Sequence, residues 1–365
     1  MGNIKIRNHR ITSMAAFVLA IAIALALAAC GSSGGSAPPA DAASPPAAPA
    51  ASGNSGDAEA DGADLFPIKT SLRYDCTLAP YLVADRLGYF AEEGLRLDWT
   101  GEIPSSEYTT SVVSGDNDFA DNHPNALALQ IYGGAEVTAV GRSIIEPGPE
   151  VDPRLRHMRY YVNPSAAGVT TLADLADYKP GEKLKSAGYQ DTCETFILNK
   201  ALDAIGVPRD KLEWITFDAD VAKIEALKLG QVDIIGVHPP FFDAAAEAGL
   251  IQIGDSADAQ LGEAAGVYLY FFSNKFIAEH PDEVAGFVRA VTKAQQYANA
   301  NVDEVAKWTG EWIGQEVKGN HYYSETTEID EATVQPWIDD LVASGTLPEG
   351  AIQVTDIITH QFESK

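Results

Sequence analysis

Side chains suited to ligand binding gather at four points of the sequence, each directly after a stretch that predicts a short β-strand. Their types are aromatic, acidic, amide, hydroxyl and imidazole, and such a mixture is typical of a small-molecule pocket. Because ligands of open α/β sheets bind outside the carboxyl ends of the strands, we expect these points to meet at one site. The predicted ligand-binding residues are Tyr74, Asp75, Cys76, Asp121, Asn122, His123, Tyr189, Gln190, Asp191, Thr192, His238 and Phe241.

Most of these residues also have a purely structural interpretation. His123 and His238 both precede a proline and can be buried structural histidines, and Phe241 can belong to the core. Helix capping alone can account for Asp75, Thr77, Asp191 and Asp220. Tyr74 and Tyr189 are stronger candidates, because a tyrosine at a strand end offers both a ring face and a hydroxyl. The concentration of these types, more than any single residue, favours a pocket.

Basic side chains are missing from these strand ends, with Arg142 in the Gly141-Arg142-Ser143 turn as the exception. A guanidinium that donates two parallel hydrogen bonds is the usual means of holding a sulfonate or a carboxylate. Nitrate, sulfonate and taurine-type solutes are therefore disfavoured, although helix N-termini can also hold an anion. The composition favours a neutral or cationic heteroaromatic ligand such as an aminopyrimidine.

The elements expected to position these residues alternate between strands and helices. The predicted strands of a first block lie at 68–74, 95–99, 119–120 and 137–140, and those of a second block at 183–187, 212–216, 233–237 and 251–253. An apolar strand at 267–272 returns to the first block, and the remainder is predicted to be helical. Strands separated by helices of about ten residues indicate βαβ units and mainly parallel sheets.

Three strings of this sequence resemble a known family. They are RLGYFAEEGL at 86–95, SGDNDFA at 114–120 and AKIEALKLGQVD at 222–233. TLADL at 171–175 and SNKF at 273–276 add weaker matches. Together they resemble the extracytoplasmic solute-binding proteins of ABC importers, in the nitrate/sulfonate/taurine and thiamine-pyrimidine-binding group. The resemblance covers about residues 66–300.

The resemblance implies an α/β, periplasmic-binding-protein-like fold, with two α/β lobes, a ligand cleft between them and two crossover connections. Lobe I is expected at 65–163 plus 268–365 and lobe II at 164–267, with crossings near 162–164 and 266–267. A small-molecule solute would bind by lobe closure, in the thiamine-pyrimidine-like or the nitrate/sulfonate range, and an ABC permease and ATPase would be the partners. We expect a monomer.

The sequence supports an enzymatic function less well than a solute-binding function. The sequence has no Gly-x-Ser-x-Gly elbow, phosphate loop or His-Glu-x-x-His helix. Pyrimidine synthases share the implied fold but carry a cysteine-rich iron motif that is missing here. We therefore predict that the protein is not an enzyme and uses no cofactor. A pyrimidine-synthase-like enzyme or a ligand sensor on the same fold remains an alternative.

The N-terminus predicts export and lipid anchoring. Lys5, Arg7 and Arg10 precede an uncharged apolar run, and small residues then lead to Cys30. This order is that of a secretory signal over 1–29, and Leu-Ala-Ala-Cys resembles the bacterial lipobox, in which the cysteine is acylated, for example by palmitate. Residues 30–64 are rich in Gly, Ser, Ala and Pro and predict a disordered tether. The domain is expected outside the cytoplasm, held on a bacterial membrane.

Charge and cysteine content exclude other classes. The net charge of −27 would repel a phosphate backbone, so we expect no nucleic-acid partner. Apart from Cys30, the chain has Cys76 and Cys193, without the spacing of a local zinc motif, so we predict no metal site. Whether Cys76 and Cys193 form a disulfide stays open at this point.

Overall fold

The computed structural model describes residues 65–75, 77–188, 192–217 and 219–363. The predicted signal peptide, the tether and Cys30 lie outside this part of the chain, as do Cys76, Tyr189, Gln190 and Asp191. Among the described residues, no helix combines the length and apolar composition that a membrane crossing requires.

Two small sheets are built from the strands of the first block and one later strand. Strand β1 (Phe66–Leu72) pairs in parallel with β2 (Leu95–Glu102). Strand β10 (Leu269–Ser273) lies between β3 (Phe119–Asn122) and β4 (Val137–Arg142) and is antiparallel to both. The late strand β10 therefore completes a sheet whose other strands come from the first block, as the sequence predicted.

The second block forms a five-stranded sheet in the order β7-β6-β8-β5-β9. Strand β6 (Leu184–Ala187) is parallel to β7 (Leu212–Ile215) and to β8 (Ile234–Val237). Strand β5 (Arg159–Val162) is antiparallel to β8 and to β9 (Ile251–Asp255). The five-stranded sheet is thus mixed, the three-stranded sheet is antiparallel and the two-stranded sheet is parallel, so the prediction of mainly parallel sheets was wrong.

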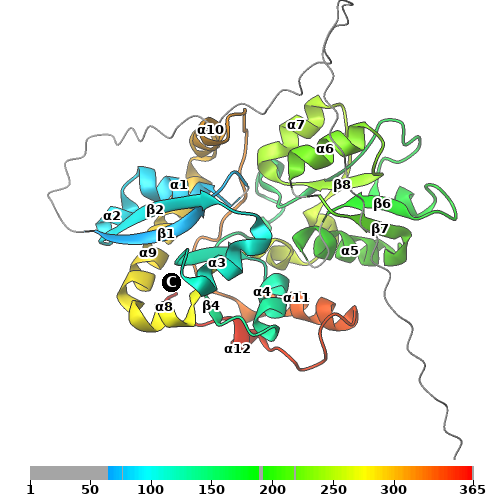
Figure 1. The fold of residues 1–365 in the computed structure, drawn as a ribbon. Helices are drawn as coiled ribbons and strands as arrows, with labels where there is room; N and C mark the ends of the chain where they lie inside the picture. Colours follow the sequence, from blue (N-terminus) through cyan, green and yellow to red (C-terminus); the bar gives the residue numbers. More distant parts are fainter. Residues whose placement is uncertain (1–64, 76, 189–191, 218, 364–365) are drawn as a thin grey trace, which may run out of the picture. The chain divides into compact units, whose positions relative to one another are not determined.

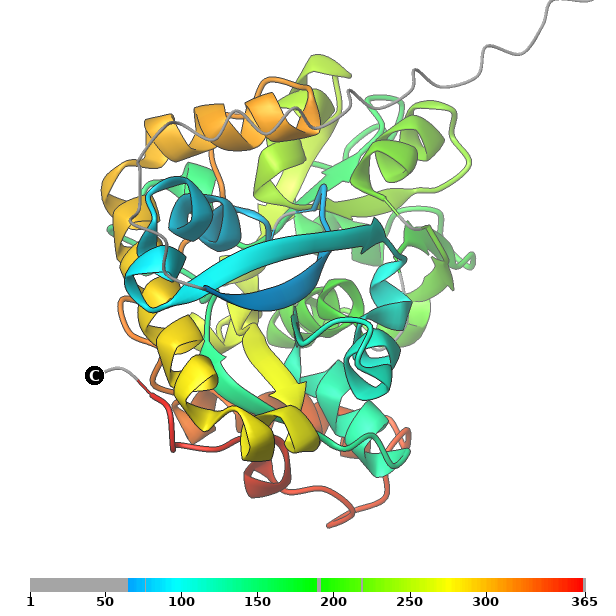
Figure 2. The ribbon, with the colours of Figure 1, turned by 60° about the vertical axis from the view of Figure 1, so that its left-hand side comes forward.

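Helices pack against these sheets, while the β1–β2 pair has one face toward the viewer in Figure 2 that no helix of the described chain covers (Figures 1 and 2). The first block contributes α1 (Ala79–Arg86), α2 (Tyr89–Glu92), α3 (Tyr108–Ser114) and α4 (Pro124–Tyr132). The second contributes α5 (Cys193–Ile205), α6 (Asp220–Lys228) and α7 (Phe242–Glu247). The C-terminal part contributes α8 (Asn274–Glu279), α9 (Pro281–Ala300), α10 (Val302–Ile313), α11 (Glu331–Ala343) and α12 (Val354–Ile357).

Strand periodicity explains this layering. Tyr160 and Val162 of β5 join the core under α5, whereas Tyr161 joins the opposite core under α6 and α7, which lie on the other side of the sheet in Figure 1. In β10, Tyr270 and Phe272 face the core of α1 and α9, and the alternate residues face α4, α11 and α12. A strand buried on both faces reads as a continuous apolar run, which is why β10 was visible in the sequence.

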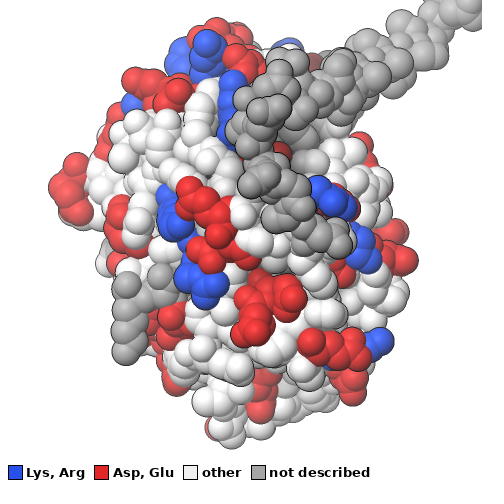
Figure 3. All heavy atoms as spheres, turned by 90° about the vertical axis from the view of Figure 1, so that its left-hand side faces the viewer, with Lys and Arg blue, Asp and Glu red and all other residues white. Residues whose placement is uncertain are grey.

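Two charged contacts tie the early helix α2 to α9. Glu93 bonds Arg289 at 2.8 Å and Glu92 bonds Lys293 at 2.7 Å. Figure 3 shows the face on which acidic and basic side chains intermingle, with acidic ones prevailing. An acidic surface of this kind accords with the net charge.

Strand β5 was not predicted. Its pairing with β8 and β9 places Arg159–Val162 in the same sheet as the strands of 164–267, and Asn163 Nδ2 donates to the Leu227 carbonyl at 2.9 Å. The expected crossing at 162–164 thus begins at the last residue of β5, a strand that is paired on both sides within the five-stranded sheet. The lobe bounds stay a prediction, but the strand pairing favours a first crossing before Arg159.

Candidate functional site

The carboxyl end of β1 leads to a buried cation. Arg73 is 1% exposed, and its Nη1 donates to Thr77 Oγ1 at 2.8 Å and to the Asp121 carboxylate. The hydroxyl of Tyr81 also donates to Asp121. The guanidinium lies 4.3 Å from the centre of the Tyr108 ring. We call Arg73, Thr77, Tyr81, Tyr108 and Asp121 the Arg73 cluster.

This cluster leaves part of its hydrogen-bonding capacity unused. Arg73 Nε and Nη2 are buried without a hydrogen-bond partner in the described structure. Burial raises the pKa of the Asp121 carboxyl, and the Arg73 charge opposes that rise. Asp75 is half-buried beside the Arg73 cluster. Its carboxylate accepts a hydrogen bond from the Thr77 backbone at 2.9 Å and one from the Tyr108 hydroxyl at 3.0 Å.

Four histidines form a second cluster, drawn from segments far apart in the sequence. The ring centre of His157 lies 5.4 Å from that of His123, 5.7 Å from that of His238 and 4.5 Å from that of His321. Cys193, a buried free thiol at the first turn of α5, places its Sγ 3.6 Å from His238 Nε2. We call these four histidines and Cys193 the histidine cluster.

The histidines differ in protonation. Burial lowers the pKa of His123 to about 3, and it also lowers the pKa values of His157 and His321, so these three imidazoles are neutral. Burial disfavours the charge of His238 too, but the Asp220 carboxylate, 2.9 Å from Nδ1, outweighs it and raises the pKa of His238 to about 10. His238 is therefore cationic at neutral pH.

A buried lysine bonds the same carboxylate as His238. Lys223 bonds Asp220 at 2.6 Å and also bonds Glu194, and all three side chains are almost fully buried. Burial alone would raise the pKa of Asp220, but Lys223 and His238 together lower it below its usual range. Each cation in this network is therefore matched by at least one carboxylate.

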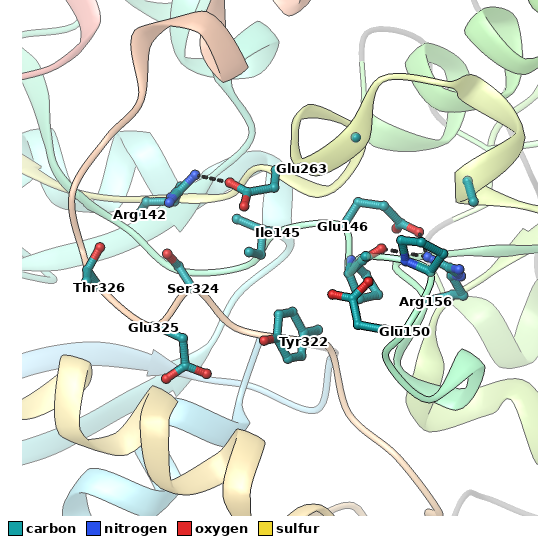
Figure 4. Close-up of a pocket in the computed structure, with 15 residues that line it drawn as sticks. Arg142, Ile145, Glu146, Glu150, Arg156, Glu263, Tyr322, Ser324, Glu325 and Thr326 are labelled. Atoms are coloured by element: carbon teal, nitrogen blue, oxygen red, sulfur yellow. Dashed lines mark hydrogen bonds and ion pairs between the residues drawn. The ribbon is translucent and has the colours of Figure 1, made fainter.

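A cavity of about 490 Å³ opens elsewhere, among the segments that connect the sheets (Figure 4). Its basic residues are paired: Arg142 bonds Glu263 at 2.7 Å and Arg156 bonds Glu146 at 3.0 Å. Tyr322 also lines it. Of the described strand-end residues predicted from the sequence, none lines this cavity, and Arg142, the noted exception, is already neutralised by Glu263.

The structure separates the described candidates into groups. Asp121 belongs to the Arg73 cluster and Asp75 adjoins it, while His123 and His238 belong to the histidine cluster. Asn122 accepts from the His123 backbone at 2.9 Å. Further out, Tyr74 is 39% exposed, Thr192 caps α5 in a capping box with Thr195, and Phe241 packs against the core near α7.

Sequence reasoning missed several buried residues of these groups: the basic or imidazole side chains Arg73, His157, Lys223 and His321, and also Tyr81, Tyr108, Cys193 and Glu194. The statement that basic residues are absent from the strand ends was therefore wrong for Arg73, which directly follows β1. Lys223 lies in α6 and bonds Asp220 and Glu194. Arg73 was visible as a lone cation between Leu72 and Tyr74. His157 and His321 carried no signal, because they lie in irregular segments.

The sequence profile of the NMT1/THI5-like family matches residues 76–305. The chain belongs to the NMT1/THI5-like family. This confirms the resemblance drawn from the three sequence strings. No curated protein matches this NMT1/THI5-like chain.

Solved structures show the fold of this NMT1/THI5-like protein. The periplasmic aliphatic sulphonate-binding protein SsuA of Escherichia coli is similar with a TM-score of 0.63 at 14% identity, over 80% of this chain and 92% of that one. The periplasmic nitrate-binding protein NrtA of Synechocystis PCC 6803 gives 0.65 at 13%, over 82% and 87%. The desulfurization enzyme DSZB gives 0.54 at 11%, over 81% and 97%. The predicted periplasmic-binding-protein fold is thereby confirmed.

Proposed function

We propose that this protein is a solute-binding lipoprotein that works outside the cytoplasm and delivers a small organic molecule to an ABC permease and ATPase. Family membership and the fold shared with SsuA and NrtA support a binding role. The signal-like N-terminus and Cys30 support export and an acyl anchor. The protein acts as a monomer on this proposal.

The solute binds where the strand ends of the two blocks meet, and the blocks close on it. His123, after β3, and His238, after β8, lie in one cluster although they belong to different sheets. Clefts at such strand ends are the usual ligand sites of α/β folds. Rotation about the two connections would open and close this cleft.

The observation that carries the choice of ligand is the pairing of the buried cations. Arg73 is matched by Asp121, and Lys223 is matched by Asp220 and Glu194. A cation whose charge is already neutralised attracts an anionic solute weakly. Asp75 and exposed Tyr74 add a carboxylate and a ring face at the rim. The site therefore favours a neutral or cationic heteroaromatic compound, such as a thiamine-pyrimidine-like molecule.

One observation favours the anionic alternative. The two unpartnered nitrogens of Arg73 can donate to a nitrate or a sulfonate if the cleft opens toward them. In that case a taurine-type solute would compete with Asp121 for the guanidinium. An enzymatic role on this fold, as DSZB has, would need a chemical partner in addition to the solute. A role as a ligand sensor would need a signalling partner in place of the permease.

A thermal-shift screen of the full chain tests the ligand class. We expect an aminopyrimidine to raise the melting temperature, with stabilisation of about 2.7 kcal/mol at 100 times its dissociation constant. Taurine and nitrate should leave it unchanged. Asp75→Asn should weaken binding of a cationic pyrimidine, whereas Asp116→Asn, at an exposed turn, is the matched control.

Stabilisation by taurine or nitrate, with none by any heteroaromatic compound, would overturn the ligand assignment. Small-angle scattering tests closure separately, since a bound solute should make the protein more compact. A fractionation experiment tests the anchor: Cys30→Ala should release the protein from the membrane fraction.

A further inference from the structure

The histidine cluster brings together three residues that ligate metals in proteins. One ligand atom each from His123, His157 and Cys193 lies within 4.8 Å of the other two, and all three side chains are buried. They come from three separate places in the fold: the end of β3, the segment before β5 and the first turn of α5. No local sequence motif links them, which is why the sequence predicted no metal site.

His157 needs a partner that the protein does not supply. It is 1% exposed, and neither ring nitrogen has a hydrogen-bond partner among the described residues. The same holds for both nitrogens of His321, which stacks on it at 4.5 Å. A buried polar group without a partner costs roughly 1–3 kcal/mol, so such groups in a folded protein call for an explanation.

His123 and Cys193 have neighbours that orient them in the way that metal ligands are oriented in other proteins. His123 Nδ1 bonds the Val267 carbonyl at 2.7 Å, which fixes the ring and leaves Nε2 for an ion. Metal-ligating histidines commonly use their second nitrogen in this way. Cys193 Sγ is 3.6 Å from His238 Nε2, so an imidazole N–H faces the sulfur.

We propose that His123, His157 and Cys193 bind a divalent d-block metal ion of the zinc type. Two imidazoles and a thiolate are the donor set that Zn²⁺ and Co²⁺ accept, whereas Mg²⁺ and Ca²⁺ require oxygen ligands. Tetrahedral zinc holds its ligand atoms about 3.4–3.6 Å apart, so ligand atoms that lie within 4.8 Å of one another need to close by no more than about 1.4 Å. His321, whose ring stacks on that of His157 at 4.5 Å, is a further imidazole beside the site.

This inference goes beyond the proposed solute transport. An ion at this position would join the end of β3 to the first turn of α5, and so connect the two sheets on either side of the proposed cleft. Metal binding can be measured without any solute, and its outcome is therefore independent of the ligand screen.

Cobalt titration of the chelator-treated full chain tests the site. We expect one Co²⁺ per chain to give tetrahedral ligand-field bands together with a sulfur-to-cobalt charge-transfer band, and Zn²⁺ to displace it. Cys193→Ser should abolish the charge-transfer band. His123→Gln and His157→Gln should each weaken Co²⁺ binding more than 100-fold, since loss of a ligand exceeds the roughly 10–100-fold effect of losing an outer partner.

His360→Gln is the matched control, because His360 lies at the surface near Glu331 and Glu363. It should bind Co²⁺ like the unaltered chain. Circular dichroism of each metal-free variant separates loss of a ligand from loss of the fold. The proposal fails if Co²⁺ shows only octahedral bands, or if folded Cys193→Ser and His157→Gln proteins bind as tightly as the unaltered chain.

Discussion

The buried ion pair between Arg73 and Asp121 provides a quantitative test of the site. Both side chains are about 1% exposed, so neither charge reaches water if its partner is removed. Breaking a buried pair on one side costs about 3–5 kcal/mol, because an uncompensated charge stays in the interior. This is a large part of the 5–15 kcal/mol by which a typical domain is stable.

We expect Arg73→Met and Asp121→Asn each to lower the free energy of unfolding by about 3–5 kcal/mol. The double variant has no unpaired charge, and its asparagine can still accept from the Tyr81 hydroxyl. It should therefore cost no more than one single variant, which corresponds to a coupling energy of about 3 kcal/mol or more. Urea unfolding followed by tryptophan fluorescence and circular dichroism measures all three.

The surface pair Arg86 and Glu311 is the matched control. Its charged atoms are 3.5 Å apart, and about half of each side chain is exposed. The corresponding Arg86→Met and Glu311→Gln variants should change stability by less than about 1 kcal/mol with little coupling. Additive costs at Arg73 and Asp121, or an Arg73→Met variant as stable as Arg86→Met, would refute the assignment of a desolvated ion pair.

Four further predictions concern single positions. Trp337→Ala should cost about 3–5 kcal/mol in urea unfolding, since this fully buried ring packs among core residues, whereas Trp337→Phe should lose mainly the indole hydrogen bond. Lys223→Met should cost a similar amount, because Glu194 loses the lysine and Asp220 is left with His238, and adding Glu194→Gln to the same chain should recover part of the loss. Gly266→Ala should lower the melting temperature, because its Cβ would come within 2.5 Å of the Glu146 backbone nitrogen; an unchanged value would contradict this packing. Burial raises the pKa of Asp118, so the folded chain holds the carboxyl proton more tightly than the unfolded chain does. The free energy of unfolding should therefore fall as the pH rises above 3.8, the ordinary pKa of an aspartate. Urea unfolding at a series of pH values measures this slope, and Asp118→Asn should flatten it.

The sequence was most informative where periodicity is long and the boundary residues are distinctive. The start of helix α4 is recognisable in the sequence, because Pro124 suits the first turn of a helix. In the C-terminal part, which was predicted to be helical, Val284, Phe287, Val288 and Val291 recur at helical spacing and form the buried face of α9. These signals are local, so a single sequence can carry them.

The features that were missed depend on tertiary pairing. Strand β5 is four residues long, and only its neighbours β8 and β9 distinguish it from a loop. The contact between His157 and His321 joins two irregular segments. The strand-end rule found His123 and His238 because they follow strands, but it has no means to find partners outside them. Cys76 and 189–191 lie outside the described structure, so these site predictions stay predictions.

The central position of β10 has a consequence for synthesis of the chain. Phe272 of β10 pairs with Phe119 of β3, and the same strand pairs with β4. During translation, β3 and β4 emerge long before the strand that must lie between them. Their apolar edges stay open until residue 273 has left the ribosome, and such long-range pairing is slow. The nascent chain is therefore expected to be most prone to aggregation before β10 has been made.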